Sequence, residues 1–261
     1  MTTLVLLTKI NNNNQLKQID RTLKLAFEDL DVETKILSTP ADRWPQLVLA
    51  GEDEGIAASY VSKEIGICPT SLENISKFSV LKGYITNLEK SKEELSIDVG
   101  ILKPEIVYAT IPLRHLQAQL VDGRKIALGK IAELFGLCED LPVCVKVSLL
   151  NEDENRIDAE LSTDQIEKYQ VWRESLLDRL LVLGLSVNEI KMTLEHAKLD
   201  RDIIGVETLG MFEHALTCKL GTDAAGLIPK IGRNLRNAKF AVFNPRRLNE
   251  FLQTTRLAFT D

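Results

Sequence analysis

The sequence is poor in the residues that most often carry catalysis or covalent cross-links. Its 261 residues include three histidines and four cysteines, and aromatic side chains make up 5%. It has no Cys-x-x-Cys pair and no Gly-x-Ser-x-Gly, P-loop or dinucleotide-binding pattern. No uncharged stretch reaches a dozen residues, whereas a membrane-spanning helix needs about 20 apolar ones. These absences argue against a disulfide scaffold, a membrane-spanning protein and the common hydrolases and nucleotide-dependent enzymes.

The overall composition is that of a globular protein, with 44% hydrophobic and 27% charged residues. This mix excludes a disordered chain, a collagen and a coiled-coil rod, and the length suits two or three modules. The cysteines lie among apolar neighbours, which predicts buried, reduced thiols in a cytoplasmic protein. His214 and Cys218 are four residues apart, a spacing that would share a helix face and suggests zinc. Two ligands do not complete a tetrahedral site, so we predict no metal and no cofactor.

Charge is distributed unevenly along the chain. Residues 149–218 carry seven basic and 15 acidic groups, whereas residues 219–261 carry eight basic and three acidic groups. The whole chain has a formal net charge of −6, which argues against indiscriminate binding to nucleic acid. The basic C-terminal segment predicts a local anion-binding surface, and the acidic segment is a candidate contact for a basic partner protein.

Residues 1–76 have the pattern of a small α+β module. Leu16, Ile19 and Leu23 recur at three- and four-residue steps, which predicts a helix from Gln15 that Asn11–Asn14 can cap. A second helix is expected from Ile56 to Ile65. Strands are expected at Thr3–Ile10, Val32–Leu37 and Gln46–Ala50. The order β-α-β-β-α resembles a ferredoxin-like module, a fold class that hosts many functions.

Residues 77–161 consist of short strand-like segments separated by turns. The predicted strands are Val80–Ile85, Leu95–Gly100, Tyr108–Leu113, Leu141–Leu149 and Arg156–Leu161. A helical stretch around Leu116 to Phe135 lies between the third and the fourth of these strands. This order, together with Gly83, Ile97-Asp98-Val99-Gly100 and Ala109-Thr110-Ile111-Pro112-Leu113, resembles the OB barrel of ribosomal-protein-type RNA-binding domains.

The OB resemblance implies a face that binds single-stranded nucleic acid by stacking bases on aromatic side chains beside a basic groove. The second strand offers Leu95 and Ser96 where such barrels usually have an aromatic residue. The candidate stacking residues are therefore Tyr84 and Tyr108. The candidate phosphate contacts are Lys82, Lys90, Lys92, Arg114, Arg124 and Lys125. The alternative is a barrel that serves as a spacer or a protein-docking unit.

Residues 162–261 are predicted to form a further α+β module. We expect a helix from Thr163 to Leu183, with Trp172 in the core, and a helix around Leu227 to Leu235. The pattern of Ser186–Leu194 fits a strand or a helix equally well. Lys239–Phe243 is a predicted strand, and a final helix is predicted from Arg246 to Leu252.

The segment from Gly221 to Leu235 is punctuated by glycines and is basic. It contains Asp223-Ala-Ala-Gly226 and Pro229-Lys230-Ile231-Gly232-Arg233, which resemble the KH motif of transcription-elongation proteins of the NusA kind. In that motif a Gly-x-x-Gly loop grips a nucleic-acid backbone, and here Pro229 replaces the first glycine. The resemblance implies phosphate contacts from Lys230, Arg233, Arg236, Lys239, Arg246 and Arg247. The alternative is a core helix with a proline bend.

Taken whole, the chain resembles the archaeal domain-of-unknown-function family 2110. The resemblance is carried by Ala50-Gly51-Glu52-Asp53, by Val206-Glu207-x-Leu209-Gly210, and by Cys218-Lys219-x-Gly221-Thr222-Asp223-Ala224-x-Gly226-Leu227-Ile228-Pro229. It implies an archaeal cytoplasmic protein and implies no activity.

Two enzyme interpretations were weighed against a binding function. Asp200, Asp202, Glu207, Glu213 and His214 would suit a metal-dependent nuclease, and Gly221–Gly232 would suit the phosphate of a small ligand at a helix N-terminus. We predict instead a non-catalytic, RNA-associated factor of the archaeal translation or transcription machinery. Its expected partners are RNA or a ribonucleoprotein, such as a ribosome or transcription complex. The alternative is a protein–protein adaptor whose barrel no longer binds nucleic acid.

Overall fold

The chain folds into two compact units, each assembled from two stretches of sequence. The computed structural model describes residues 1–37, 43–151, 155–232, 235 and 238–257. The first unit comprises Met1–Ile75 and Val99–Ile106, and the second comprises Ser76–Asp98 and Val107–Asp261. No helix in the described ranges is both long enough and apolar enough to cross a bilayer.

The N-terminal unit contains a three-stranded antiparallel sheet and two helices, in the predicted order β-α-β-β-α. The elements are β1 (Thr2–Val5), α1 (Asn13–Ala26), β2 (Glu33–Leu37), β3 (Gln46–Ala50), α2 (Glu54–Glu64), β4 (Thr70–Ser71) and the short 3-10 helix η1 (Leu72–Asn74). The strand order is β1-β3-β2. Asn12 caps α1 as predicted, because its side chain accepts from the Gln15 N–H while the Gln15 side chain accepts from the Asn12 N–H.

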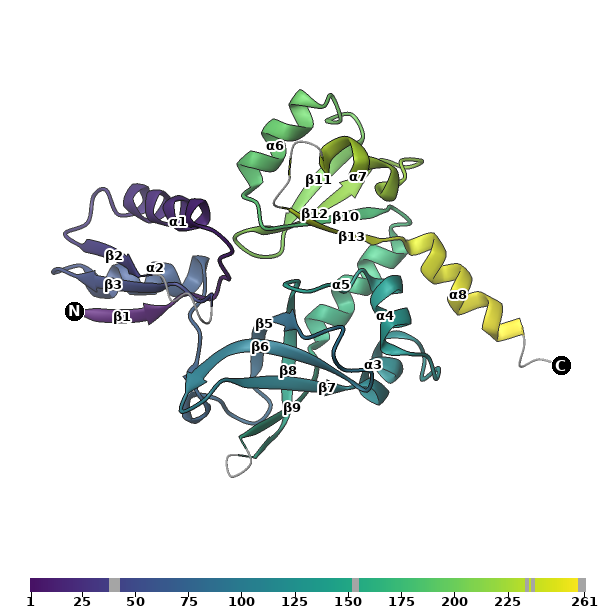
Figure 1. The fold of residues 1–261 in the computed structure, drawn as a ribbon, viewed down its shortest axis with the longest axis horizontal. Coiled ribbons are helices and arrows are strands. Elements are labelled where there is room, and N and C mark those ends of the chain that lie inside the picture. The colour runs from purple at the N-terminus through teal and green to yellow at the C-terminus, as the bar shows by residue number, and fades with distance from the viewer. Residues whose placement is uncertain (38–42, 152–154, 233–234, 236–237, 258–261) are drawn as a thin grey trace. The chain divides into compact units, whose positions relative to one another are not determined.

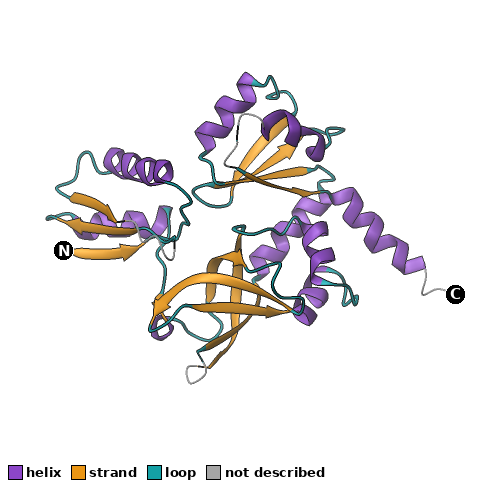
Figure 2. Cartoon of the chain, viewed as in Figure 1, coloured by secondary structure: helices purple, strands orange, loops and turns teal. Residues whose placement is uncertain are grey.

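The second unit begins with a closed five-stranded barrel (Figures 1 and 2). Its strands are β5 (Val80–Thr86), β6 (Glu94–Lys103), β7 (Val107–Pro112), β8 (Pro142–Asn151) and β9 (Arg156–Leu161). They pair in the order β6-β5-β8-β9-β7, and a β6–β7 pairing closes the ring. The parallel β7–β9 pair and the helices α3 (Leu113–Leu120) and α4 (Leu128–Phe135) between β7 and β8 give the connectivity of an OB barrel.

The strand β6 contributes to both units. Its first half pairs with β5, and its second half pairs in parallel with β4 and belongs to the N-terminal unit. Gly100 lies in this second half with a φ of 79°, and the space that a Cβ would need is filled by the side chain of Cys68. Glycine is therefore required here both for the backbone conformation and for the close approach of Cys68.

The rest of the second unit is α+β, as predicted. Its elements are α5 (Thr163–Glu174), β10 (Arg179–Leu183), α6 (Val187–His196), β11 (Ile203–Thr208), β12 (Glu213–Cys218), α7 (Ala224–Gly232), β13 (Lys239–Phe243) and α8 (Pro245–Leu257). The four strands form an antiparallel sheet in the order β11-β12-β10-β13. The connectivity from β10 to β13 is the split β-α-β-β-α-β arrangement, and the core includes the buried residues Leu180, Val182, Leu216, Leu227 and Ile231.

The helix predicted from Thr163 to Leu183 was wrong in its second half. The helix α5 ends at Glu174, Leu176 takes a φ of 56°, and residues 179–183 form β10. All five residues of β10 are buried. Helices α6 and α7 cover one face of the strand, at Leu180 and Val182, and the residues that follow α4 cover the other face, where Gly136 lies against Leu181. A strand buried on both faces has the same continuous apolar run as a buried helix, so periodicity could not separate them. The segment Ser186–Leu194, whose pattern fitted a strand or a helix, lies in helix α6, which begins with a capping box formed by Ser186 and Glu189.

Aromatic side chains pack the barrel helices against the C-terminal sheet. Phe135 of α4 lies edge-on to Tyr169 of α5 at 5.3 Å between ring centroids, and Trp172 lies 5.4 Å from Phe243 of β13. Trp172 is 4% exposed, which confirms its assignment to the core. The barrel and the C-terminal sheet therefore share one hydrophobic contact region within the second unit.

Candidate nucleic-acid interface

Tyr84, one of the two predicted stacking residues, is not accessible. It lies on the outer side of the barrel strand β5, but its side chain is fully buried. Its hydroxyl donates to Glu213 Oε2 at 3.4 Å, so the C-terminal sheet covers the ring. The prediction that Tyr84 stacks on a base is therefore corrected, since a ring with no exposed face cannot receive one.

Tyr108, the second predicted stacking residue, is half-buried on β7 among negative charges. Burial raises the pKa of its hydroxyl, and the carboxylates of Asp98 and Glu139 raise it further. Glu139 also accepts hydrogen bonds from the backbone N–H groups of Asn87 and Leu88, at 3.2 and 3.3 Å. Near Tyr108 the barrel thus carries the half-buried Glu139 and the buried Asp98, whose negative charges would oppose a phosphate backbone.

Three of the predicted cations lie at one end of the barrel. Lys90 and Lys92 are exposed in the loop between β5 and β6, and Arg114 is exposed at the start of α3. The Leu113 N–H donates to the Glu93 carbonyl at 2.7 Å, which holds this loop against the start of α3. None of the three cations makes an ion pair with a residue that the structure describes.

The predicted C-terminal cations fall into two groups, and those of the first group make no ion pair with a described residue. Lys230 near the end of α7 and Arg246 at the start of α8 are exposed and form no ion pair within the described ranges. Arg233 and Arg236 lie outside the described residues. The segment Pro229–Gly232, which the sequence likens to a KH loop, forms the last turn of α7, so it is helix rather than an open loop.

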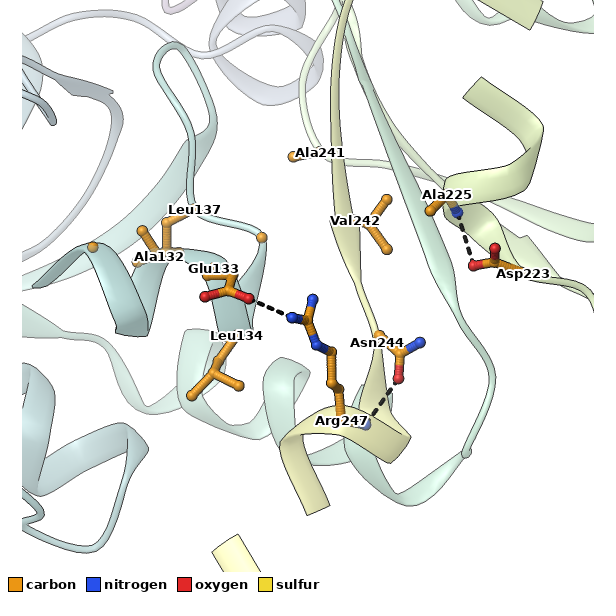
Figure 3. A pocket seen from close by; sticks show the side chains of 12 residues that line it. Ala132, Glu133, Leu134, Leu137, Asp223, Ala225, Ala241, Val242, Asn244 and Arg247 are labelled. Carbon is orange, nitrogen blue, oxygen red and sulfur yellow. Dashed lines mark hydrogen bonds and ion pairs between the residues drawn. The ribbon is translucent and has the colours of Figure 1, made fainter. Parts of the chain in front are cut away.

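The second group is already paired with carboxylates of the barrel helix region. Lys239 Nζ lies 2.6 Å from Asp140 Oδ2, and Asp140 is buried. Arg247 Nη2 lies 2.6 Å from Glu133 Oε1 on α4 (Figure 3). These two cations therefore hold α4 and the turn after it against the C-terminal sheet, and their charge is not free for phosphate.

A cavity of about 650 Å³ lies between α4, β13 and the first turn of α7 (Figure 3). Small and apolar residues line most of it, together with the Arg247–Glu133 pair. The first N–H groups of α7 are occupied by the chain's own carboxylates: Asp178 accepts from Ala224 at 3.2 Å, and Asp223 accepts from Ala225 and Gly226 at 3.1 Å. This occupancy argues against the phosphate site considered for Gly221–Gly232.

The residues considered for a metal-dependent nuclease do not converge. His214 and Cys218 lie on a strand, β12, rather than on a helix. The His214 Nε2 lies 3.1 Å from the Leu185 carbonyl, and Glu207 accepts from the Trp172 indole at 2.9 Å. Within the ranges the structure describes, no group of three or more His, Cys, Asp or Glu side chains is placed to hold a metal ion.

The structure places one further basic and aromatic cluster that the sequence analysis missed. Phe78, just before β5, is 61% exposed. Lys77 Nζ and Lys146 Nζ lie over its ring, 5.0 and 5.5 Å from the centroid. Lys82, which was predicted, is half-buried on the same outer face of β5. Burial lowers the pKa of Lys82, while the negative charge of Glu213 raises it. The signal that was overlooked is an aromatic residue flanked by lysine in the turn before a strand.

The comparisons identify a family at both ends of the chain. The profile of the DUF2110 N-terminal domain matches residues 3–71, and that of the DUF2110 C-terminal domain matches residues 177–243. Together they cover just over half of the chain. No curated protein matches the chain by sequence.

Solved structures give low-scoring similarities. The uncharacterised protein MJ1198 from Methanocaldococcus jannaschii is 15% identical with a TM-score of 0.24, over 34% of this chain and 95% of that one. A chain of the a/eIF2alpha–aDim2p–rRNA complex from Pyrococcus horikoshii OT3 is 11% identical with a TM-score of 0.27, over 48% and 64%. The intact alpha subunit of aIF2 from Pyrococcus abyssi is 9% identical with a TM-score of 0.27, over 65% and 97%. At these scores the similarities assign no function to the chain.

Proposed function

The chain belongs to the DUF2110 family, and from that premise we propose that it is a non-catalytic, RNA-associated factor of the archaeal translation or transcription machinery. It binds through its OB-type barrel and the basic C-terminal face, with RNA or a ribonucleoprotein as the partner. The protein acts in the cytoplasm and needs no cofactor.

The observation that carries this proposal is a set of exposed cations without carboxylate partners in the described part of the chain. These cations are Lys90, Lys92, Arg114 and Lys230; Arg246 is also exposed and makes no ion pair with a described residue, but it lies close enough to Asp178 to lower the pKa of that carboxyl group. A lysine or arginine that is not neutralised within the protein can displace a counterion from a phosphate, which supplies most of the sequence-independent affinity for nucleic acid. Such contacts position a polynucleotide without reading its sequence.

A second candidate function is a protein–protein adaptor, and one observation favours it. Next to Tyr108 the barrel carries the half-buried Glu139 and the buried Asp98, and Tyr84 is buried. A partner protein with a basic surface would suit this face and the acidic segment 149–218.

The test is a binding titration with single-stranded and structured RNA at about 50 and about 200 mM salt. Contacts with several phosphates should weaken the affinity by orders of magnitude between these concentrations. The double variant Lys230→Glu/Arg246→Glu should abolish binding. The control is Lys17→Glu/Lys191→Glu, which changes the net charge equally at two exposed lysines elsewhere. Absence of binding by the wild-type protein at the lower salt concentration contradicts the proposal and favours the adaptor.

A further inference from the structure

Phe78 is an exposed aromatic side chain that the fold holds in a fixed position. Its N–H donates to the Val147 carbonyl at 2.8 Å, and the Val147 N–H donates to the Ser79 carbonyl at 3.0 Å. These two hydrogen bonds attach the turn before β5 to β8. Phe78 takes a φ of 70°, a conformation that costs an ordinary residue about 1–2 kcal/mol. Glycine or asparagine would adopt this conformation at a lower cost, so Phe78 lowers the stability of the turn relative to either residue.

Lysines surround this ring on the outer face of the barrel. Lys77 and Lys146 both lie within 5.5 Å of the ring centroid. Val80, 58% exposed, pairs with Lys146 across β5 and β8, and Lys82 pairs with Cys144 on the same face. We call this surface the aromatic–lysine strip, and its members are Lys77, Phe78, Val80, Lys82 and Lys146.

The strip carries a net positive charge. Lys146 Nζ lies 3.8 Å from Glu160 Oε1, and this is the one ion pair that the strip makes with residues in the described ranges. Lys168 lies close enough to lower the pKa of Lys82, but it is paired with Glu207 at 3.3 Å and so adds no net charge to the strip. The strip thus presents three lysines for one exposed carboxylate beside an exposed ring.

We propose that the aromatic–lysine strip binds a short single-stranded stretch of nucleic acid, with one base stacked on Phe78 and the flanking phosphates on the lysines. The proposal rests on the proposed function and adds a further contact surface on the barrel, on β5 and β8, to the exposed cations that carry that function. An unpaired base has a free π face for an aromatic side chain, and lysines beside the ring hold the backbone. With a rise of about 3.3 Å per residue, Lys82 lies about 7 Å along β5 from Val80, so the strip extends beyond the ring of Phe78 in the direction of β5.

The proposal is tested with a fluorescent reporter at the stacking position. The native Trp44 and Trp172 are buried, so Phe78→Trp adds an exposed indole whose emission a stacked base should quench. Titration with 12-mers of uridine and of deoxyuridine, which differ only in the 2′-hydroxyl, reports binding, and stronger quenching by the uridine 12-mer shows that the 2′-hydroxyl is also recognised. The control is Met192→Trp, at a 59% exposed position on α6, which should not be quenched.

Affinity measurements with variants separate this proposal from the proposed function. Phe78→Ala should weaken the binding of the uridine 12-mer about tenfold, within the range for loss of one stacked base. Lys77→Gln/Lys146→Gln should reduce the slope of log affinity against log salt by about 1.4, or 0.7 for each lost phosphate contact on a single strand. Wild-type binding that Phe78→Ala leaves unchanged overturns the strip and spares the proposed function. No binding by the wild-type protein overturns both.

Discussion

The hydroxyl of Tyr84 lies 3.4 Å from Oε2 of Glu213, and this contact joins the first strand of the barrel to the C-terminal sheet. The two residues are 129 positions apart in the sequence. An aromatic residue that an OB barrel would otherwise present to a ligand is here part of an internal contact. Tyr84 therefore takes no part in the proposed nucleic-acid surface, and the stability of the second unit depends on a buried carboxyl group.

The stability of the protein should fall as the pH rises from about 5 to about 8, because of Glu213. Burial raises the pKa of Glu213 to about 7 from its ordinary value of 4.5, against the lowering effect of Lys82 and Tyr84. Between these two values the unfolded state binds fewer protons than the folded state, so stability decreases with pH. The difference corresponds to about 3 kcal/mol. Urea unfolding at pH 5 and pH 8 measures it.

The variant Glu213→Gln should remove this pH dependence, because an amide does not titrate. The control is Glu195→Gln, at an exposed position on α6, which should keep the wild-type dependence. An identical slope of stability against pH in the wild type and in Glu213→Gln would show that Glu213 is not the titrating group.

A side chain at position 210 should destabilise the protein, because Gly210 lies against the carboxyl group of Glu213. A methyl group on Gly210 would overlap the Glu213 carboxylate and lie 3.3 Å from the Tyr84 hydroxyl. We expect Gly210→Ala to lower the free energy of unfolding by about 2 kcal/mol. The matched variant Gly205→Ala, on β11, meets nothing within 4 Å and should leave the thermal midpoint nearly unchanged. Equal midpoints for both variants would contradict the crowding at Gly210.

The ion pairs Lys239–Asp140 and Arg247–Glu133 should contribute differently to the free energy of unfolding. Lys239→Met leaves the buried carboxylate of Asp140 without its lysine, which should cost about 2 kcal/mol. Arg247→Met breaks a pair whose two side chains are 63% and 43% exposed, so the loss should stay below about 1 kcal/mol. Denaturant unfolding of both variants at one pH gives the comparison, and a larger loss for Arg247→Met would refute it.

Gly100 should be among the most sensitive positions of the N-terminal unit. Gly100→Ala would place a methyl group at a positive φ and against the side chain of Cys68, which should cost about 3 kcal/mol or more. The control is Gly55→Ala, in the first turn of α2 with nothing within 4 Å, which should change stability by less than about 1 kcal/mol. Thiol labelling of Cys68 under native conditions is a second readout, because only Gly100→Ala should expose this buried cysteine.

The sequence predicted local elements well, because their signals lie within a few residues. The cap of α1, predicted within Asn11–Asn14, and the strand Gln46–Ala50 are examples. The run Leu180–Leu183 was misassigned, because β10 is covered on both faces of its sheet and is therefore apolar on both. For the candidate site, the sequence identified the cationic residues but not the carboxylates with which Lys239 and Arg247 pair. Lys239 is 99 residues from Asp140, and no local pattern reveals such a pair.

The shared strand β6 also sets the order in which the protein can fold while it is being made. Residues 1–75 leave the ribosome first, but their unit is complete only when Val99–Ile106 have been synthesised. The barrel strand β5 lies between these two stretches, so it is made before the N-terminal unit can close. Many chains fold domain by domain from the N-terminus. Here β5 is synthesised while the N-terminal unit is still incomplete, so the folding of the two units is interleaved.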